Sequence, residues 1–435
     1  MSSTPSAGLN PVQRRTLIIL VLLGLAYFLC FAWPNSLGAR TEAMLGATSI
    51  DEPITYPYVV RMVTPAHDLR EFVNRWMIYG DYHYGYPFYF FSSVVILPVV
   101  WAHGPLFTNF TQLNLLLLRQ LISVLPMILA AGLLVFAQTR FQSIWKSVLL
   151  FILLLSIRGV VRANIQWWHP DALSVLAVVL TLILLARDRL RFGKNFGLAA
   201  VACGFAVGIK LAGFFFAPAV ALTLLAGLLR KQLSLAGAAL KALLFVAVMA
   251  GTLLITNPFL INSGARQEML NIQLDKTQLF DQGYGDPNPD YQKGPQFWEW
   301  TLSTWFAQPW LLAFLALSLL AGCFWGPNRS LNRLSLAWIV PYSIYLFWFV
   351  AVKPDQYWLP VMLPLYSAGL NLAESLPEWI KNRTFGFRPS IRLGAVVQAV
   401  VVVILLGHLG WNLGRPYSGA IARFQEGLAV ESSLQ

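Results

Sequence analysis

Long runs of apolar residues, separated by short polar segments, recur along the whole chain. The runs Leu17–Trp33, Ala236–Ile255 and Ser390–Trp411 approach or reach the roughly 20 residues that a helix needs to cross the hydrocarbon core of a bilayer. Repeated along the chain, such runs predict an all-α polytopic membrane protein. The expected transmembrane helices, about eleven in number, lie at about 17–33, 119–137, 145–161, 171–186, 196–209, 211–229, 237–256, 308–325, 334–352, 354–372 and 393–413.

Composition and charge lead to the same fold class. Hydrophobic residues make up 57% of the chain and charged residues 11%, whereas ordinary soluble domains carry roughly 25% charged residues. The net charge of +12 does not indicate nucleic-acid binding, because Lys and Arg fall mostly in short clusters between the apolar runs, which is the positive-inside pattern. The clusters expected on the cytoplasmic side are Arg14-Arg15, Arg140 with Lys146, Arg187 to Lys194, Arg230-Lys231, Arg329 with Arg333, and Lys381 to Arg392.

The remaining polar segments are then expected on the outer face of the membrane. They are a long first loop at about 34–87, the stretch Arg162–His169, the turn at Lys210, a second loop at about 257–300 and the turn Lys353–Gln356. We expect 1–413 to form one transmembrane domain with a retained first span and no appended soluble domain, and 414–435 to be a short polar tail.

Both long outer loops contain features beyond a simple linker. The stretch Ala66–Tyr79 places Leu69, Phe72 and Trp76 on one helical face, which is typical of an amphipathic helix lying in the membrane interface. The second loop carries Asp286-Pro287-Asn288-Pro289-Asp290 and several tryptophans, so we expect turns with aromatic anchors near the lipid headgroups.

The apolar stretch at 88–103 does not fit the parity of this topology. If Phe88–Trp101 crossed the membrane alone, every later segment would change sides. The stretch therefore re-enters, lies on the outer surface, or pairs with Leu113–Leu118 as two extra short spans, and we favour one of the first two.

Acidic and basic residues in the outer segments are candidates for chemistry. Asp51-Glu52 stand in the first loop, where a solvated surface is the alternative. His169-Pro170-Asp171 opens a predicted helix, just after Arg158 and Arg162. Asp171 could simply favour the positive end of that helix, but ionisable groups at membrane depth are costly and functional by default.

Two lysines and one aromatic run complete the candidates. Lys210 interrupts a long apolar stretch without an acidic neighbour in sequence, so it needs a carboxylate or a bound phosphate, unless it snorkels to the surface. Lys353 to Tyr357 (KPDQY) forms either part of the same site or a turn with a local ion pair, and Asp81–Pro87 (DYHYGYP) is otherwise an aromatic belt. Gathered on one side, these carboxylates and cations could activate a hydroxyl or amine and stabilise a phosphate leaving group.

With these segments the chain resembles the GT-C glycosyltransferases, which take sugar from a polyprenyl or dolichyl phosphate carrier, including protein O-mannosyltransferases and the aminoarabinose transferase of lipid A. The resemblance spans roughly residues 15–372 and lies in Asp51-Glu52, DYHYGYP, His169-Pro170-Asp171, Gly204–Gly213 (GFAVGIKLAG) and Lys353–Pro364 (KPDQYWLPVMLP). It implies a GT-C-like bundle whose long first extracytoplasmic loop contains the amphipathic helix. It also implies an integral membrane protein, expected in a bacterial inner membrane, with its active site on the extracytoplasmic side.

The resemblance also assigns roles to individual residues. Asp51 becomes the general base with Glu52 beside it, and the donor phosphate is bound by Lys210, Lys353, Arg162 and Arg158. The donor site is shaped by His169, Asp171, His83, Tyr82, Gln356 and Tyr357. The expected partners are a polyprenyl-phosphate-linked sugar, a lipid or glycan acceptor and membrane lipids, and the expected reaction inverts the anomeric centre.

Other interpretations remain open at this stage. A transporter or flippase of lipid-linked saccharides would also need a basic cavity, although no inverted repeat is visible. A non-catalytic membrane subunit is a third possibility. A divalent metal could bind through Asp51 or Glu52, but the sequence has no dedicated ligand cluster.

Overall fold

The computed structural model describes residues 8–285, 289–375, 384–385 and 391–414, together with residues 425, 428 and 429. Within these residues the chain is a bundle of helices with one short hairpin, β1 (Thr384–Phe385) and β2 (Ile391–Arg392). The predicted turn at 286–288, most of the basic cluster 381–392 and nearly all of the tail 414–435 lie outside the described residues.

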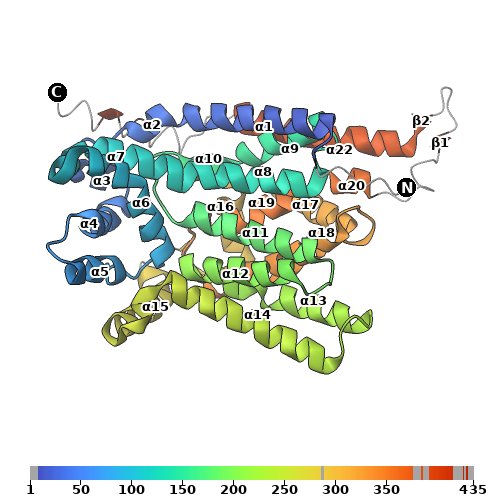
Figure 1. Cartoon of the computed structure of the whole chain (residues 1–435). Helices are drawn as coiled ribbons and strands as arrows, with labels where there is room; N and C mark the ends of the chain where they lie inside the picture. Colours follow the sequence, from blue (N-terminus) through green and yellow to red (C-terminus); the bar gives the residue numbers. More distant parts are fainter. Residues whose placement is uncertain are drawn as a thin grey trace.

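The first third of the chain builds one end of the bundle. After α1 (Pro11–Cys30), the predicted first loop folds into short helices instead of running as a loop (Figure 1). They are α2 (Ala32–Ser36), α3 (Glu42–Thr48), α4 (Glu52–Val63) and α5 (Leu69–Met77). The amphipathic α5 has Asp68 as its N-cap and leaves Leu69 and Phe72 exposed, as an interfacial helix requires.

The apolar stretch at 88–103, which did not fit the predicted number of membrane crossings, is helical. The helix α6 (Tyr86–His103) packs against α4 and the end of α12 and is followed by a 3₁₀ turn, η1 (Gly104–Phe110). The chain then runs without a break through α7 (Thr111–Leu118), the π-helical segment η2 (Arg119–Val124) and α8 (Leu125–Thr139). Leu113–Leu118 is therefore the start of a longer helix, and its pairing with Phe88–Trp101 as a separate short span is wrong.

The centre of the bundle is formed by helices that are buried along most of their length. The helix α11 (Asp171–Asp188) packs against α8 and α12 (Lys194–Ile209), and every residue of α19 (Leu359–Ser367) is buried. By contrast, the peripheral helices α1 and α14 (Leu235–Thr256) expose leucine and valine side chains over most of their surface, as expected for a surface in contact with lipid.

Several predicted spans differ from the observed helices. The span 145–161 is divided into α9 (Ile144–Leu155) and α10 (Arg158–Asn164), which are bent by 63°. The predicted span 354–372 is not one helix. Its main element, α19, is about 14 Å long and too short to cross a bilayer, and it lies between the 3₁₀ turn η7 (Asp355–Trp358) and the short helix α20 (Asn371–Glu374). Its apolar character reflects burial inside the protein.

The second predicted loop is also mostly helical. It contains η4 (Pro258–Ile261), the long polar helix α15 (Ser263–Gln282), η5 (Gly283–Gly285), η6 (Pro295–Trp298) and α16 (Glu299–Trp305). The remaining elements are η3 (Leu211–Phe216), α13 (Ala217–Leu229), α17 (Pro309–Phe324), α18 (Arg329–Phe349) and α22 (Leu393–Gly414). Among the described residues, five helices are long and apolar enough to cross a membrane, or up to seven if two bent pairs each count as one span, so the number eleven is not confirmed.

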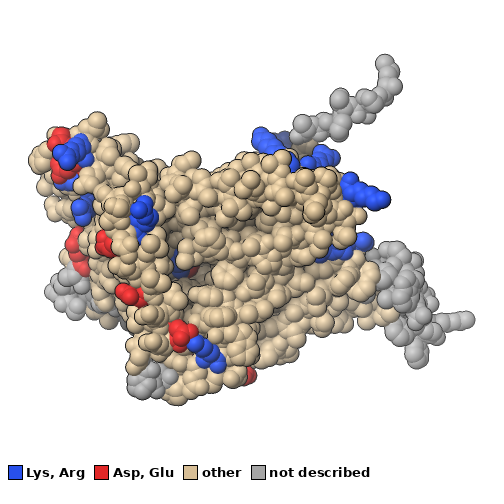
Figure 2. Space-filling model, turned by 90° about the horizontal axis from the view of Figure 1, so that it is seen from below, with Lys and Arg blue, Asp and Glu red and all other residues tan. Residues whose placement is uncertain are grey.

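Charge is distributed unequally between the two ends of the bundle. On the face seen in Figure 2, Lys and Arg stand without Asp or Glu at the end that carries the N-terminus, whereas acidic and basic residues occur together at the end with α4, α5 and α15. Lys146 at the basic end pairs with Glu374 at 2.6 Å. The helix α11 connects the two ends, so Asp171 and Arg187 lie about 25 Å apart along it. The two predicted charge groups therefore occupy opposite ends.

Candidate active site

Asp51 lies at the mixed-charge end, at the residue before α4. Its side chain is 36% exposed, and its Oδ2 atom lies 3.8 Å from Nε2 of the buried His169. The Asp51 side chain does not cap its own helix, so its carboxylate faces the cluster around His169. This arrangement leaves Asp51 accessible to a molecule entering from outside.

His169 connects Asp51 to Asp171 and Lys210. Its Nδ1 atom contacts one carboxylate oxygen of Asp171, and the other oxygen accepts a hydrogen bond from Nζ of Lys210. Burial lowers the pKa of His169, so the imidazole is neutral at pH 7. The Asp171–Lys210 pair thus joins the start of α11 to the end of α12 and answers the question of which carboxylate partners Lys210.

Aromatic rings surround the ammonium group of Lys210. Its Nζ atom lies 4.7 Å from the ring centroid of Tyr357 and 5.9 Å from that of Tyr84. Lys210 itself is in extended backbone between α12 and η3, and its side chain is 17% exposed. A ligand phosphate could therefore reach the ammonium group from the open side while Asp171 holds it in place.

Tyr84 comes from the DYHYGYP segment and completes the cluster. Its hydroxyl lies 2.8 Å from Nε2 of His169, and burial raises its pKa well above the ordinary value, so the hydroxyl remains protonated. Asp81 fixes the same segment, because it accepts hydrogen bonds from Tyr89 and from the backbone and side chain of His83.

Gly85 allows this segment to lie directly on the end of α12. A Cβ atom at position 85 would stand 1.5 Å from the carbonyl oxygen of Gly208, and the Gly85 amide donates to the carbonyl of Ile209 at 3.2 Å. Only glycine permits such an approach of two backbones. The contact places Tyr84 beside Lys210.

Lys276 is a cation of the cluster that the sequence did not single out. It lies on α15, with Nζ 5.2 Å from the Tyr84 ring centroid and 3.5 Å from the carbonyl oxygen of His83. Burial lowers its pKa to about 8, and the positive charge of Lys210 acts in the same direction. The polar composition of α15 resembled a loop, so nothing in the sequence distinguished Lys276 from other surface lysines.

Glu52, the neighbour of Asp51, points into the protein. Its side chain is fully buried and bound by Nε of Arg119 at 2.9 Å and Nη2 at 2.5 Å. The amide of Trp168 donates to the same carboxylate at 2.8 Å. Arg119 also donates to the carbonyls of Asn35 and Leu37, both at 2.9 Å. An arginine inside an apolar run is costly unless it is paired, so Arg119 was the sequence signal that could have predicted a buried acidic partner.

The other three cations predicted to bind the donor phosphate contact residues outside the cluster around His169. Arg162 pairs with Asp355 at 2.8 Å and lies over the ring of Trp305, whereas the buried Arg158 lies over Trp411. Lys353 lies over Trp298, donates to the carbonyls of Gln292 and Ala351, and has its pKa lowered to about 8 by burial. These contacts do not place the three cations with Asp51.

Of the residues predicted to shape the donor site, some contact the cluster around Lys210 and others lie beside it. Tyr357 contacts Lys210, and Gln356 precedes it in η7. The ring of Tyr82 is buried against Phe259, and His83 is half-exposed and paired with Asp81 at 2.7 Å. Tyr82 and His83 therefore support the segment that presents Tyr84.

The described residues contain no group of three or more His, Cys, Asp or Glu side chains that could hold a metal ion. Both oxygens of Glu52 are used by Arg119, so of the two carboxylates considered for a metal only Asp51 offers free oxygen atoms. A hard divalent cation prefers oxygen ligands, and Mg²⁺ is commonly held by one or two carboxylates together with waters and substrate phosphates.

Comparisons with known proteins identify the fold. No family model and no curated protein match the sequence. Solved structures of the Archaeoglobus fulgidus oligosaccharyltransferase do match. The form tethered to an acceptor peptide containing the NVT sequon has 14% identity and a TM-score of 0.50, covering 95% of this chain and 55% of that one. The form bound to an inhibitory peptide and a dolichol-phosphate, named AglB, has 12% identity and a TM-score of 0.51, covering 95% and 56%.

These likenesses show that the chain shares the fold of the matched part of that archaeal enzyme. The apo form of the same archaeal enzyme aligns equally well, with 14% identity, a TM-score of 0.50 and coverage of 95% and 56%. The chain therefore spans just over half the length of the solved structures that it resembles.

Proposed function

We propose that this protein is an inverting membrane glycosyltransferase that moves a sugar from a polyprenyl-phosphate carrier to a lipid or glycan acceptor at the outer face of the membrane. The observation that carries the proposal is the line of contacts from Asp51 through His169 and Asp171 to Lys210. It joins an accessible carboxylate to a cation at one end of a GT-C fold.

Asp51 is the group that takes the acceptor's proton. As the acceptor hydroxyl oxygen bonds to the anomeric carbon, its proton passes to the Asp51 carboxylate. The bond from that carbon to the phosphate oxygen breaks, and its electron pair leaves with the polyprenyl phosphate. Acceptor and leaving group occupy opposite faces of the sugar, so the anomeric configuration inverts.

Lys210 and Lys276 stabilise the charge that develops on the leaving phosphate. Both ammonium groups lie within 6 Å of the Tyr84 ring, Lys210 from the segment after α12 and Lys276 from α15, so a phosphate beside that ring could contact both. A structural neighbour binds a dolichol-phosphate, which supports a lipid phosphate as the donor's carrier. We place Tyr357 and Tyr84 against the sugar or the first carrier units.

Glu52 acts as a positioning residue. With Arg119 it fixes the start of α4, and through the Trp168 amide it fixes the segment that leads to His169. The acidic pair therefore has two separate tasks in this proposal, with Asp51 reacting and Glu52 holding the backbone that carries both sides of the site.

The neighbours act on peptides, but the resemblance of the sequence is to enzymes that transfer a single sugar. We therefore propose a monosaccharide donor, and the mixed-charge end as the extracytoplasmic face by the positive-inside rule. The bacterial inner membrane is the location that suits this resemblance.

The test is the release of polyprenyl phosphate by the purified protein. A panel of polyprenyl-phosphate monosaccharides is supplied with membrane lipid and glycan extracts as acceptors, and the product's anomeric configuration is determined by NMR. The proposal expects acceptor-dependent release with an inverted product. Transport of intact lipid-linked sugar into the opposite leaflet of proteoliposomes, without any cleavage, would replace it with the flippase interpretation.

A further inference from the structure

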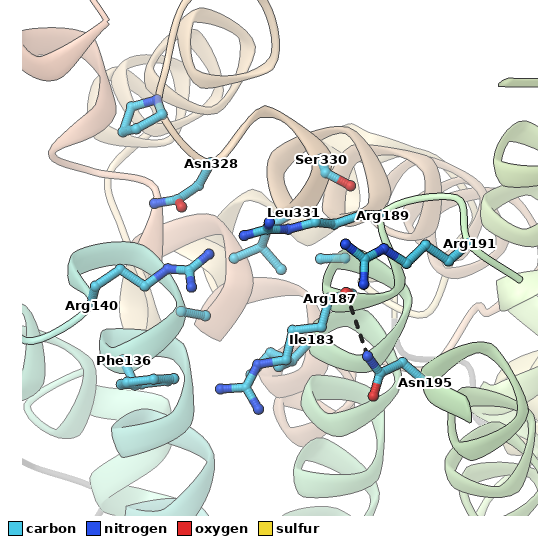
Figure 3. A pocket seen from close by; sticks show the side chains of 13 residues that line it. Phe136, Arg140, Ile183, Arg187, Arg189, Arg191, Asn195, Asn328, Ser330 and Leu331 are labelled. Atoms are coloured by element: carbon cyan, nitrogen blue, oxygen red, sulfur yellow. Dashed lines mark hydrogen bonds between the residues drawn. The ribbon is translucent and has the colours of Figure 1, made fainter. Parts of the chain in front are cut away.

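At the end of the bundle opposite Asp51, four arginines converge on one pocket. Arg140 follows α8, and Arg187, Arg189 and Arg191 lie at the end of α11 and just after it (Figure 3). The pocket has a volume of about 530 Å³ and is closed on another side by Asn328 and neighbouring residues at the start of α18. It lies at the end where the face seen in Figure 2 carries Lys and Arg but no Asp or Glu.

The residues that line this pocket include no carboxylate. Among the described residues, none of the four guanidinium groups lies within ion-pair distance of an acidic side chain, whereas Arg119 and Arg162 each have a carboxylate partner. Arg187 stacks over the ring of Phe136 at 5.1 Å. Four unbalanced positive charges around one concave space repel one another, and an anion between them would relieve that repulsion.

Asp188 lies among these arginines in the sequence but binds backbone amides. It is the acidic residue within this basic run, but its buried carboxylate accepts hydrogen bonds from the backbone amides of Phe192, Gly193 and Phe196, at 2.7, 3.1 and 3.2 Å. Asp188 therefore fixes the turn between α11 and α12 instead of neutralising a guanidinium. Arg140 and Arg189 adopt left-handed backbone, a conformation that few non-glycine residues take.

The chemistry of the pocket matches one class of ligand. Guanidinium groups bind phosphate oxygens through paired hydrogen bonds, and several of them suit a group that carries more than one negative charge. Arginines that only obeyed the positive-inside rule would need no shared concave site. We infer that the Arg140, Arg187, Arg189 and Arg191 pocket binds a phosphate-bearing anion, either the headgroup of an anionic lipid or a soluble phosphate or pyrophosphate.

Binding is measured with two probes on the full-length protein. The first is inorganic pyrophosphate, titrated against detergent-purified protein by calorimetry. The second is phosphatidylglycerol, whose retention is followed by native mass spectrometry after reconstitution in nanodiscs containing equal amounts of phosphatidylglycerol and phosphatidylcholine. Saturable pyrophosphate binding identifies a soluble source, and selective retention of phosphatidylglycerol identifies a lipid source.

The variant is Arg140→Gln/Arg189→Gln/Arg191→Gln, and its matched control is Arg14→Gln/Arg15→Gln/Arg230→Gln. The control removes the same charge outside the pocket lining. Its arginines lie near the pocket, because Gln13 beside Arg14 donates to the Arg140 carbonyl and Gly227 near Arg230 packs against Phe192. We expect the pocket variant to lower affinity at least about tenfold and the control to change it less than about twofold.

Two results would overturn the inference. One is wild-type protein that binds neither probe saturably, a measurement that needs no variant to fold. The other is equal weakening by the pocket and control variants, which would indicate general charge attraction. If the triple variant does not fold, Arg191→Gln alone is compared with Arg230→Gln under the same criteria.

Discussion

Arg119 binds both carboxylate oxygens of Glu52 in a fully buried ion pair, one residue along the chain from the exposed Asp51. The pair links three segments, because Arg119 also donates to the carbonyls of Asn35 in α2 and Leu37 just after it, and Glu52 accepts a hydrogen bond from the Trp168 amide. Adjacent acidic residues therefore differ completely in surroundings, since one faces the site and the other is locked inside the protein.

Removing Arg119 should destabilise the protein strongly. Arg119→Ala leaves the Glu52 charge buried and without its partner, which typically costs about 3–5 kcal/mol of unfolding free energy. Thermal unfolding in detergent measures the effect, with Arg70→Ala, an exposed arginine of α5, as the control. Similar unfolding temperatures for the two variants would show that the buried pair does not hold this end together.

Gly85→Ala should disturb the site through the backbone. The new Cβ atom has no room beside the Gly208 carbonyl, so the Tyr84 segment must shift, at a cost of about 1–3 kcal/mol. Gly251→Ala on α14 is the control, because a Cβ atom there meets nothing within 4 Å. We expect the first variant to lose both stability and transfer activity and the second to keep both. If both variants keep full activity, the close contact is not needed.

Lys276 predicts a pH dependence of donor use. Its pKa is lowered to about 8, so the ammonium form that binds phosphate predominates below pH 8 and is lost as the pH rises above it. The kcat/KM for the donor in wild-type protein should therefore fall between pH 7 and 9.

Arginine substitutions identify which lysine causes that fall, because arginine stays charged throughout this range. Lys276→Arg should flatten the alkaline limb of the pH profile. The matched control is Lys353→Arg, since Lys353 also has a pKa of about 8 but contacts Trp298 and backbone carbonyls. A profile flattened only by Lys353→Arg would transfer the phosphate role to Lys353.

The orientation of the bundle is tested by labelling. In a variant whose three native cysteines are replaced, Asn74→Cys on α5 and Gln232→Cys between α13 and α14 place single exposed thiols at the mixed-charge and the basic regions, respectively. An impermeant maleimide should label position 74 in intact cells and position 232 only after permeabilisation. Labelling of both positions in intact cells would contradict the proposed topology.

The sequence predicted the all-α class of the fold. It also singled out four residues that the structure brings together, Asp51, His169, Asp171 and Lys210, and their roles stay predictions. Apolar runs and basic clusters are local signals, so the all-α membrane bundle and the placement of Asp171 and Arg187 at opposite ends followed from them directly. Hydropathy could not distinguish lipid contact from burial inside the protein, which is why the fully buried α19 was predicted as a span.

Contacts between distant segments were not accessible in the same way. Asp51 and Glu52 have the same local sequence context, and only Arg119, 67 residues later, decides which of them is buried. Lys276 reaches Tyr84 because α15 folds back over the site, a tertiary arrangement without a periodic signature. The sequence could indicate which kinds of residue form the site, whereas the contact partner of each residue became known only from the folded structure.

The central claim, that Asp51 is the base of a sugar transfer, is tested most directly by Asp51→Asn. Acceptor-dependent release of polyprenyl phosphate is measured in this variant, in wild-type protein and in Asp281→Asn, whose exposed aspartate pairs with Lys293 outside the cluster. Because general-base help contributes about 10²–10⁴-fold, we expect Asp51→Asn to lose that factor while its unfolding temperature and donor binding stay unchanged and Asp281→Asn keeps full activity. Wild-type release by Asp51→Asn would contradict the account.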